Sequence, residues 1–147
     1  MLLFRRRAGG LEFLLAHPGG PFFARKDLGV WTIPKGEAAP AEDLRDRARI
    51  EFAEEVGFEP PRDGYLALGT IQQKGGKIVH AWAVPGDLPP EFVQRSNTFE
   101  LEWPPHSGKR QEFPEVDRAE FFPGEVARQK IKPAQVELLT RAQALTG

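Results

Sequence analysis

The chain contains no cysteine. Disulfide bonds and thiolate metal ligands are therefore excluded, and the absence is compatible with a reducing compartment. Long apolar runs are also missing, because residues 1–4 are followed at once by three arginines at positions 5–7. This stretch is far shorter than the apolar region of a signal peptide or the roughly 20 residues of a membrane span. We therefore expect a cytoplasmic protein without a membrane partner.

An excess of charge of one sign is missing as well. The formal net charge is -1 at pH 7, with 28% charged and 40% hydrophobic residues. This near balance gives no bulk electrostatic reason to bind nucleic acid or an anionic membrane, and the composition is ordinary for a globular protein. The length of 147 residues fits one compact domain covering residues 1–147.

The first half of the chain combines strand patterns with one long helical pattern. Residues 2–6 and 11–16 read as two strands joined by a tight turn rich in glycine. A short extended piece follows at residues 31–33, and a helix is predicted over residues 41–56, with Gly57 placed to end it. Apolar residues recur every four positions along this helix and predict a buried seam of Leu44, Ala48, Phe52 and Val56.

The second half of the chain predicts more strands and then two helices. The strands are expected at residues 65–72, 77–84, 97–103 and 116–122, and the helices at residues 125–130 and 133–145. In the last helix, Val136, Leu139 and Leu145 are expected to face inward. This order predicts an α/β (α+β) layered domain with a mixed sheet between helices.

The long helix carries an acidic face. Glu51, Glu54 and Glu55 stand at positions i, i+3 and i+4, so an α-helix projects all three carboxylates from one side. Their mutual repulsion would be offset by a hard divalent cation such as Mg2+, which takes carboxylate oxygens together with water and phosphate oxygens. A carboxylate that is not needed for coordination can accept a proton from an attacking water. Taken alone, however, such a face is more often plain solvated surface.

The surrounding sequence resembles the Nudix box, whose pattern is G-x5-E-x7-R-E-U-x-E-E-x-G-U with U an apolar residue. The matching positions are Gly36, Glu42, Glu51, Phe52, Glu54, Glu55, Gly57 and Phe58. The resemblance implies a Nudix-type α/β/α sandwich with a mixed central sheet. It also implies a hydrolase that uses Mg2+ or Mn2+ to cleave a diphosphate linkage.

One box position differs from the pattern, because Ile50 stands where the family has arginine. Isoleucine neither carries charge nor donates a side-chain hydrogen bond, so it cannot hold a box carboxylate as the arginine is expected to do. Arg49 is next in the chain but about 100° away around the helix, which makes it an imperfect substitute. Two readings stay open: a tolerated substitution in an active enzyme, and an enzyme that is impaired or specialised.

The resemblance also implies roles for individual residues. Glu51, Glu54 and Glu55 are the expected metal ligands and catalytic carboxylates, with Glu42 in a supporting role. The backbone at Gly36 is expected to join the metal shell. A further carboxylate from a later segment often completes such sites, and Glu115 is our choice, with Glu112 as the alternative.

The sequence just before the box narrows the range of candidate substrates. Trp31-Thr-Ile-Pro-Lys35-Gly resembles the W-x-x-P-K-G sequence of Nudix hydrolases that act on diadenosine polyphosphates and on diphosphoinositol polyphosphates. The Lys35 ammonium would suit a polyphosphate chain, and Arg25 and Lys26 could add phosphate contacts. An aromatic ring could stack on a base, and the candidates are Phe22, Phe23, Tyr65 and Trp82.

The expected activity is therefore hydrolysis of a nucleoside diphosphate-linked compound, with dinucleoside polyphosphates first among the substrates. Nucleoside triphosphates, sugar nucleotides and the 5′ end of triphosphorylated RNA stay open. The partner is then a small-molecule nucleotide and not an extended nucleic acid, and the protein is expected to be a monomer or a homodimer. The alternative is a nucleotide-binding sensor or regulator that keeps the fold and has weak or no hydrolysis.

Overall fold

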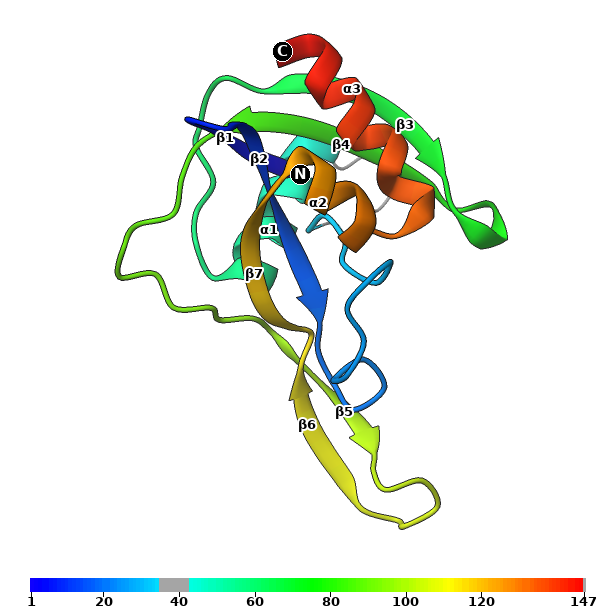
Figure 1. Ribbon diagram of the computed structural model, residues 1–147. Coiled ribbons are helices and arrows are strands. Elements are labelled where there is room, and N and C mark those ends of the chain that lie inside the picture. Colours follow the sequence, from blue (N-terminus) through cyan, green and yellow to red (C-terminus); the bar gives the residue numbers. More distant parts are fainter. Residues whose placement is uncertain (35–42, 147) are drawn as a thin grey trace.

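The computed structural model describes residues 1–34 and 43–146, and its main feature is a mixed five-stranded sheet (Figure 1). Strands β1 (Leu2–Arg7) and β2 (Gly10–Pro18) form the predicted antiparallel hairpin, with Phe4 opposite Phe13. Its turn requires a positive φ of 118° at Gly10, which glycine adopts without steric cost.

The remaining strands of the sheet flank this hairpin. The strand order is β3-β4-β1-β2-β7. β3 (Leu66–Gln72) and β4 (Ile78–Pro85) are antiparallel and joined by the short 3-10 turn η1 (Lys74–Gly76). β4 runs parallel to β1, and β7 (Val116–Pro123) runs antiparallel to β2. The prediction of a mixed sheet is therefore confirmed.

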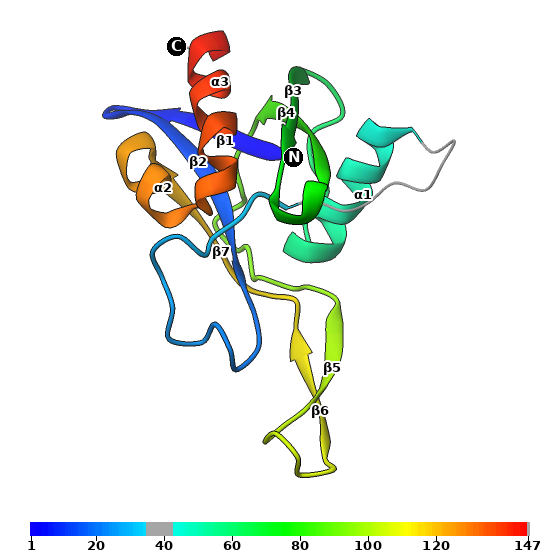
Figure 2. The ribbon, with the colours of Figure 1, turned by 90° about the vertical axis from the view of Figure 1, so that its right-hand side faces the viewer.

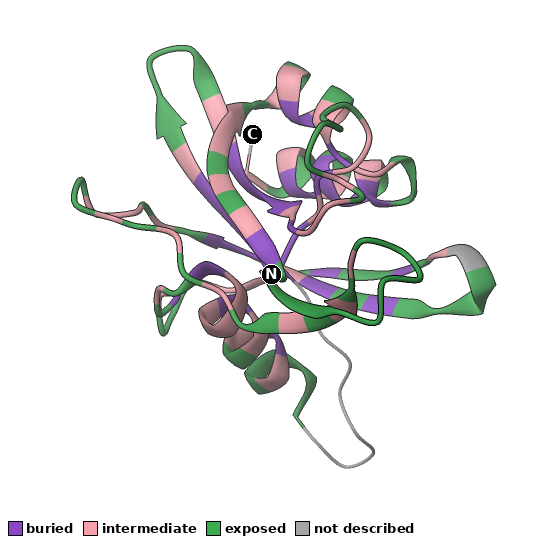
Figure 3. Cartoon of the chain, turned by 90° about the horizontal axis from the view of Figure 1, so that it is seen from below, coloured by how far each residue is buried: buried purple, intermediate pink, exposed green. Residues whose placement is uncertain are grey.

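Helices cover both faces of the sheet. α1 (Leu44–Val56) lies on one face, and α2 (Gly124–Lys130) and α3 (Val136–Thr146) lie on the other (Figure 2). Successive side chains of a strand point to opposite faces, so β1 sends Leu2 toward α3 and Leu3 toward α1. The buried residues accordingly lie along the sheet and on the inner sides of the helices (Figure 3). The predicted α/β/α sandwich is confirmed.

The seam of α1 is buried at three of its four predicted positions. Ala48, Phe52 and Val56 are buried against the sheet, and Gly57 ends the helix in a left-handed conformation as predicted. The prediction for Leu44 was wrong. This residue begins the helix and is 38% exposed, because it lies in a first turn next to solvent.

The C-terminal helical region is divided in two. The predicted helix over residues 133–145 is a 3-10 turn, η2 (Pro133–Gln135), followed by α3. Its buried face passes through Leu138, Leu139 and Ala142, whereas Leu145 in the last turn is 55% exposed, so its predicted inward position was wrong. In the described parts of the chain, every helix is too short or too polar to cross a membrane.

A second, two-stranded sheet projects from the five-stranded one (Figures 1 and 2). It pairs β5 (Thr98–Glu102) with β6 (Arg110–Pro114). The sequence predicted a strand near β5 but none at β6, because Arg-Gln-Glu-Phe-Pro lacks the alternation of apolar and polar residues. Contact between the rings of Phe22 and Trp103 joins this hairpin to loop 19–30, the connection that follows β2.

Candidate active site

The acidic face of α1 is partly buried, and among the described residues Arg47 pairs with Glu51 and Glu54. Nε of Arg47 donates a 2.9 Å hydrogen bond to Oε1 of Glu51, and Nη2 donates a second one to the same oxygen. Nη2 also lies 3.9 Å from Oε2 of Glu54. The Glu51 side chain is 17% exposed and that of Glu54 is 40% exposed. Glu55, the third carboxylate of this face, is half-buried.

Backbone hydrogen bonds bring Glu115 to the same end of α1. The N–H of Asn97 donates to the carbonyl oxygen of Glu54 at 3.0 Å, and the N–H of Glu115 donates to the carbonyl oxygen of Asn97 at 2.8 Å. On its other side, the carbonyl oxygen of Glu115 accepts from the N–H of Gly19 at 2.9 Å. Glu115 therefore occupies the junction between β6 and β7, beside the last turn of α1.

The charges at this junction influence one another. Partial desolvation raises the pKa of the Glu115 carboxyl above its ordinary value, and the nearby carboxylates of Glu51 and Glu54 raise it further. Glu112, the alternative candidate, lies on β6, where it accepts a hydrogen bond from the hydroxyl of Thr98. Of these two candidates, Glu115 is thus the one that shares an electrostatic environment with α1.

The carboxylates are grouped but do not converge. Within residues 1–34 and 43–146, no three His, Asp or Glu side chains gather closely enough to hold a metal ion. Desolvation, together with the carboxylates of Glu51 and Glu54, nevertheless raises the pKa of Glu115, so these three groups lie near one another. Carboxylate oxygens are the donors that Mg2+ and Mn2+ prefer, so the donor chemistry fits such an ion. Lys35, Gly36 and Glu42 lie outside the described residues.

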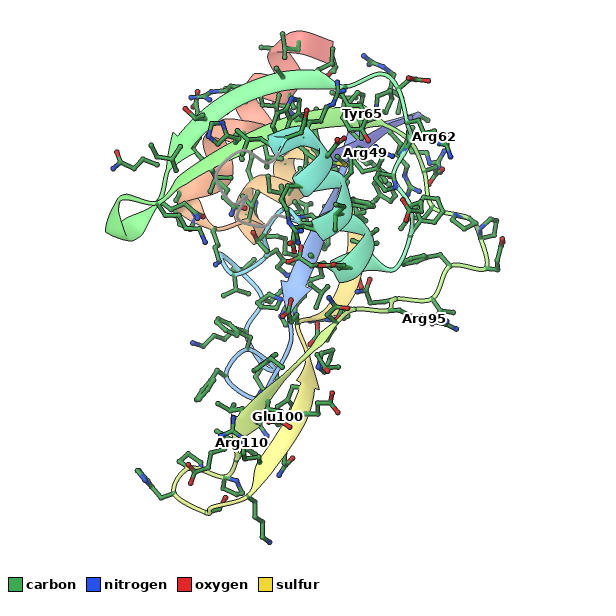
Figure 4. The ribbon with its side chains drawn as sticks, turned by 180° about the vertical axis from the view of Figure 1, so that it is seen from behind. Arg49, Arg62, Tyr65, Arg95, Glu100 and Arg110 are labelled. Carbon is green, nitrogen blue, oxygen red and sulfur yellow. The ribbon has the colours of Figure 1, made fainter. Side chains whose placement is uncertain are left out.

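The arginine next to Ile50 does not contact the carboxylates of the acidic face. Arg49 lies 3.7 Å from a carboxylate oxygen of Asp46 and beside Tyr65 (Figure 4). Ile50 is 46% exposed, and it lines an open cavity of about 500 Å³ together with Glu54. Within the part of the chain that the structure describes, the cation that reaches Glu51 is therefore Arg47, which was not predicted from the sequence. Its i, i+4 spacing to Glu51 was the signal that could have found it.

The last turn of α1 is held by the loop that follows β4, residues 86–97. A helix leaves its last four carbonyl groups without partners inside the helix, and here all four accept hydrogen bonds. One donor is Gly57 itself; the others are the side chain of Gln94 and the backbone N–H groups of Arg95 and Asn97. Arg95 is visible on this loop in Figure 4. These contacts fix the helix turn that carries Glu54 and Glu55.

Loop 19–30, which carries Arg25 and Lys26, is anchored by a buried histidine. Nδ1 of His17 lies 2.7 Å from a carboxylate oxygen of Asp117, and Nε2 lies 2.7 Å from the carbonyl oxygen of Lys26. The ammonium of Lys26 lies 5.4 Å from the ring centroid of Phe23, and Arg25 is exposed. No role was predicted for His17 from the sequence, because its partners lie on β7 and in the loop.

Most candidates for stacking on a base have packing partners in the protein. The hydroxyl of Tyr65 donates to the carbonyl oxygen of Pro61, and burial raises the pKa of this phenol. Tyr65 and Trp82 pack against the cluster around Phe52. Phe22 keeps 56% of its surface exposed. Phe22 is therefore the most accessible of these rings.

No protein-family model and no curated protein matches the chain, but solved structures do. An Ap4A hydrolase of C. elegans in a binary complex is 22% identical over 98% of this chain and 93% of that one, with a TM-score of 0.65. The NUDIX domain of Shewanella oneidensis NrtR, complexed with ADP ribose, is 17% identical over 99% and 84%, with a TM-score of 0.66. A MutT protein from Methanosarcina mazei is 16% identical over 99% and 93%, with a TM-score of 0.59. The chain therefore has the fold of Nudix proteins.

Proposed function

We propose that this chain is a single-domain Nudix hydrolase that cleaves a diphosphate linkage in a nucleoside diphosphate-linked compound, with Mg2+ or Mn2+ as its cofactor. The observation that carries the proposal is the grouping of Glu51 and Glu54 with Glu115 beside the last turns of α1, where desolvation and the two neighbouring charges raise the pKa of Glu115. Such a group of carboxylates, on a Nudix fold with matching box residues, is suited to metal-dependent hydrolysis of a diphosphate linkage.

The proposed roles rest on the resemblance to the Nudix box. Glu51, Glu54 and Glu55 would hold the ion together with Glu115 and the backbone at Gly36, and Glu42 would support them. When bound, a divalent ion would neutralise phosphate charge and would lower the pKa of an attacking water. One of the α1 glutamates then accepts the proton of that water. Glu55, a half-buried carboxylate of the same helix face, is the candidate that we test.

The proposed substrate is a dinucleoside polyphosphate. Two observations favour it: the Trp31-to-Gly36 lead-in, and the similarity in fold to an Ap4A hydrolase. Lys35, Arg25 and Lys26 would contact the phosphate chain as cations. An exposed ring such as Phe22 could stack on a base, and Tyr65 is the second candidate for this contact.

A nucleotide panel tests the proposal. The purified protein is mixed with Mg2+ and with dinucleoside polyphosphates, nucleoside triphosphates, a sugar nucleotide or 5′-triphosphorylated RNA, and the products are separated by chromatography. Metal-dependent cleavage of one class is expected. Glu55→Gln should lower kcat by roughly 100-fold or more, the order of a general-base contribution. Glu91→Gln, a change at an exposed position on loop 86–97, serves as the matched control.

The same panel separates catalysis from binding alone. If the protein binds nucleotides tightly but cleaves none of the panel compounds, the hydrolase proposal is rejected in favour of a nucleotide sensor with the same fold. Equal activity of wild type and Glu55→Gln would reject the proposed base. Turnover that persists in excess chelator would reject the metal.

A further inference from the structure

Arg47 makes an unusual contact with the acidic face of α1. Nε and Nη2 both donate to Oε1 of Glu51, and Nη2 lies 3.9 Å from Oε2 of Glu54. Among the described residues, Arg47 alone forms an ion pair with either carboxylate. Because the Arg47 and Glu51 side chains are only 26% and 17% exposed, solvent screens this pair less than an ordinary surface pair.

The geometry leaves half of the Glu51 carboxylate available. Both Arg47 donors go to Oε1, and Oε2 of Glu51 accepts no hydrogen bond within the described part of the chain. A glutamate has three side-chain torsions, and these have to be fixed before it can ligate an ion in one orientation. The guanidinium of Arg47 fixes these torsions through Oε1 of Glu51 and leaves Oε2 available to bind a metal ion.

Other residues of α1 cannot do the same. Ile50 is exposed and apolar, and the guanidinium of Arg49 is turned to Asp46 and Tyr65. We propose that Arg47 is the positioning residue of the site: it holds Glu51, and through Nη2 restrains Glu54, in the orientation that receives the metal ion. This inference rests on the proposed function.

Metal affinity and turnover test the inference together. In Arg47→Gln, Mn2+ binding measured by electron paramagnetic resonance and kcat on the best panel substrate should both fall by roughly 10- to 100-fold, the usual loss when a partner of a metal ligand is removed. KM for the nucleotide should change little, because the proposed role of Arg47 is to orient metal ligands and not to contact the substrate. Arg45→Gln is the matched control, since it removes the same charge from a position over the Tyr65 ring.

Relocation of the arginine gives the sharper test. Position 50 is three residues from Arg47 and four from Glu54, so an arginine there lies on the same side of the helix. The double variant Arg47→Gln, Ile50→Arg should therefore recover most of the lost affinity and turnover. Arg47→Lys should recover less, because an ammonium cannot reproduce the planar fork. Arg47→Lys also decides the matter if Arg47→Gln does not fold.

Three results would overturn the role of Arg47. One is Mn2+ affinity and turnover in Arg47→Gln equal to those of Arg45→Gln. Another is tighter Mn2+ binding in Arg47→Gln, which would mean that Arg47 acts only by repelling the ion. The last is full activity of Arg47→Lys. By contrast, a wild-type protein that takes up no Mn2+ and turns over no panel member would reject the proposed function itself.

Discussion

We expect the Glu115 carboxylate to destabilise the metal-free protein at neutral pH. Its folded pKa is raised by desolvation and by the charges of Glu51 and Glu54, so the folded state holds this proton more tightly than the unfolded chain. Stability from this group therefore falls as the pH rises from the ordinary glutamate pKa through the raised one, and it stays lower above that window. The penalty is absent below both pKa values.

Glu115→Gln removes the charge and keeps the shape of the side chain. In chelator, the variant should melt at a higher temperature than wild type at pH 7, and the difference should shrink toward zero below about pH 4, near the ordinary carboxyl pKa. Thermal melts across this pH range measure it. Saturating Mg2+ should reverse the order, because it stabilises the wild type more. A lower melting temperature for Glu115→Gln in chelator at pH 7 would contradict the argument.

Parts of the site follow from spacing along one helix, and parts do not. The shared face of Glu51, Glu54 and Glu55 needs only the period of an α-helix. The place of Glu115 depends on hydrogen bonds through Asn97 to α1, and the sequence left Glu112 open as an alternative. The partners of His17 lie on other segments of the chain, so no local pattern predicts them.

The C-terminal end of α1 depends on a close approach that only glycine allows. Gly57 has a φ of 78°, and a Cβ at this position would lie 2.6 Å from the carbonyl oxygen of Arg95. Gly57→Ala should therefore displace loop 86–97. It should also lower the free energy of unfolding by more than the roughly 1–2 kcal/mol that a left-handed conformation alone costs.

Denaturant unfolding of Gly57→Ala measures this loss, and Gly9→Ala is the control. A Cβ at Gly9 meets nothing within 4 Å, so this change should have little effect. Because loop 86–97 supplies the N–H that holds the Glu54 carbonyl group, Gly57→Ala should also weaken Mn2+ binding. Equal free energies of unfolding for Gly57→Ala and Gly9→Ala would show that loop 86–97 can move aside without destabilising the protein.

Helices and strands with a clear hydrophobic periodicity could be predicted from the sequence, whereas a strand stabilised only by pairing with another segment could not. The hairpin of β1 and β2 and the helix α1 follow from alternation, turn residues and a terminal glycine. β6 lacks any such alternation, and its pairing with β5 becomes visible only in the folded chain. The exposed Leu44 and Leu145 belong to terminal turns, where a periodic pattern overestimates burial.

The fold class of the whole molecule could be predicted from the sequence, but the order of the strands in the sheet could not. The order of helices and strands, with the box resemblance, predicts a mixed sheet between helical layers, and the structure confirms it. The strand order β3-β4-β1-β2-β7 follows from contacts between distant parts of the chain. Local patterns say nothing about such pairings, because each strand is compatible with several neighbours.

The parallel pairing of β1 with β4 joins two strands that lie far apart in the sequence. Leu2 lies opposite Ala83, while Phe4 also lies opposite Phe13 in the local hairpin. A fragment of residues 1–77 lacks β4 and should therefore show no cooperative thermal transition by circular dichroism, in contrast to the full chain. A sharp transition in the fragment would refute this. β1 is thus completed late, and until β4 has been synthesised its apolar side chains have only the hairpin with β2 for cover.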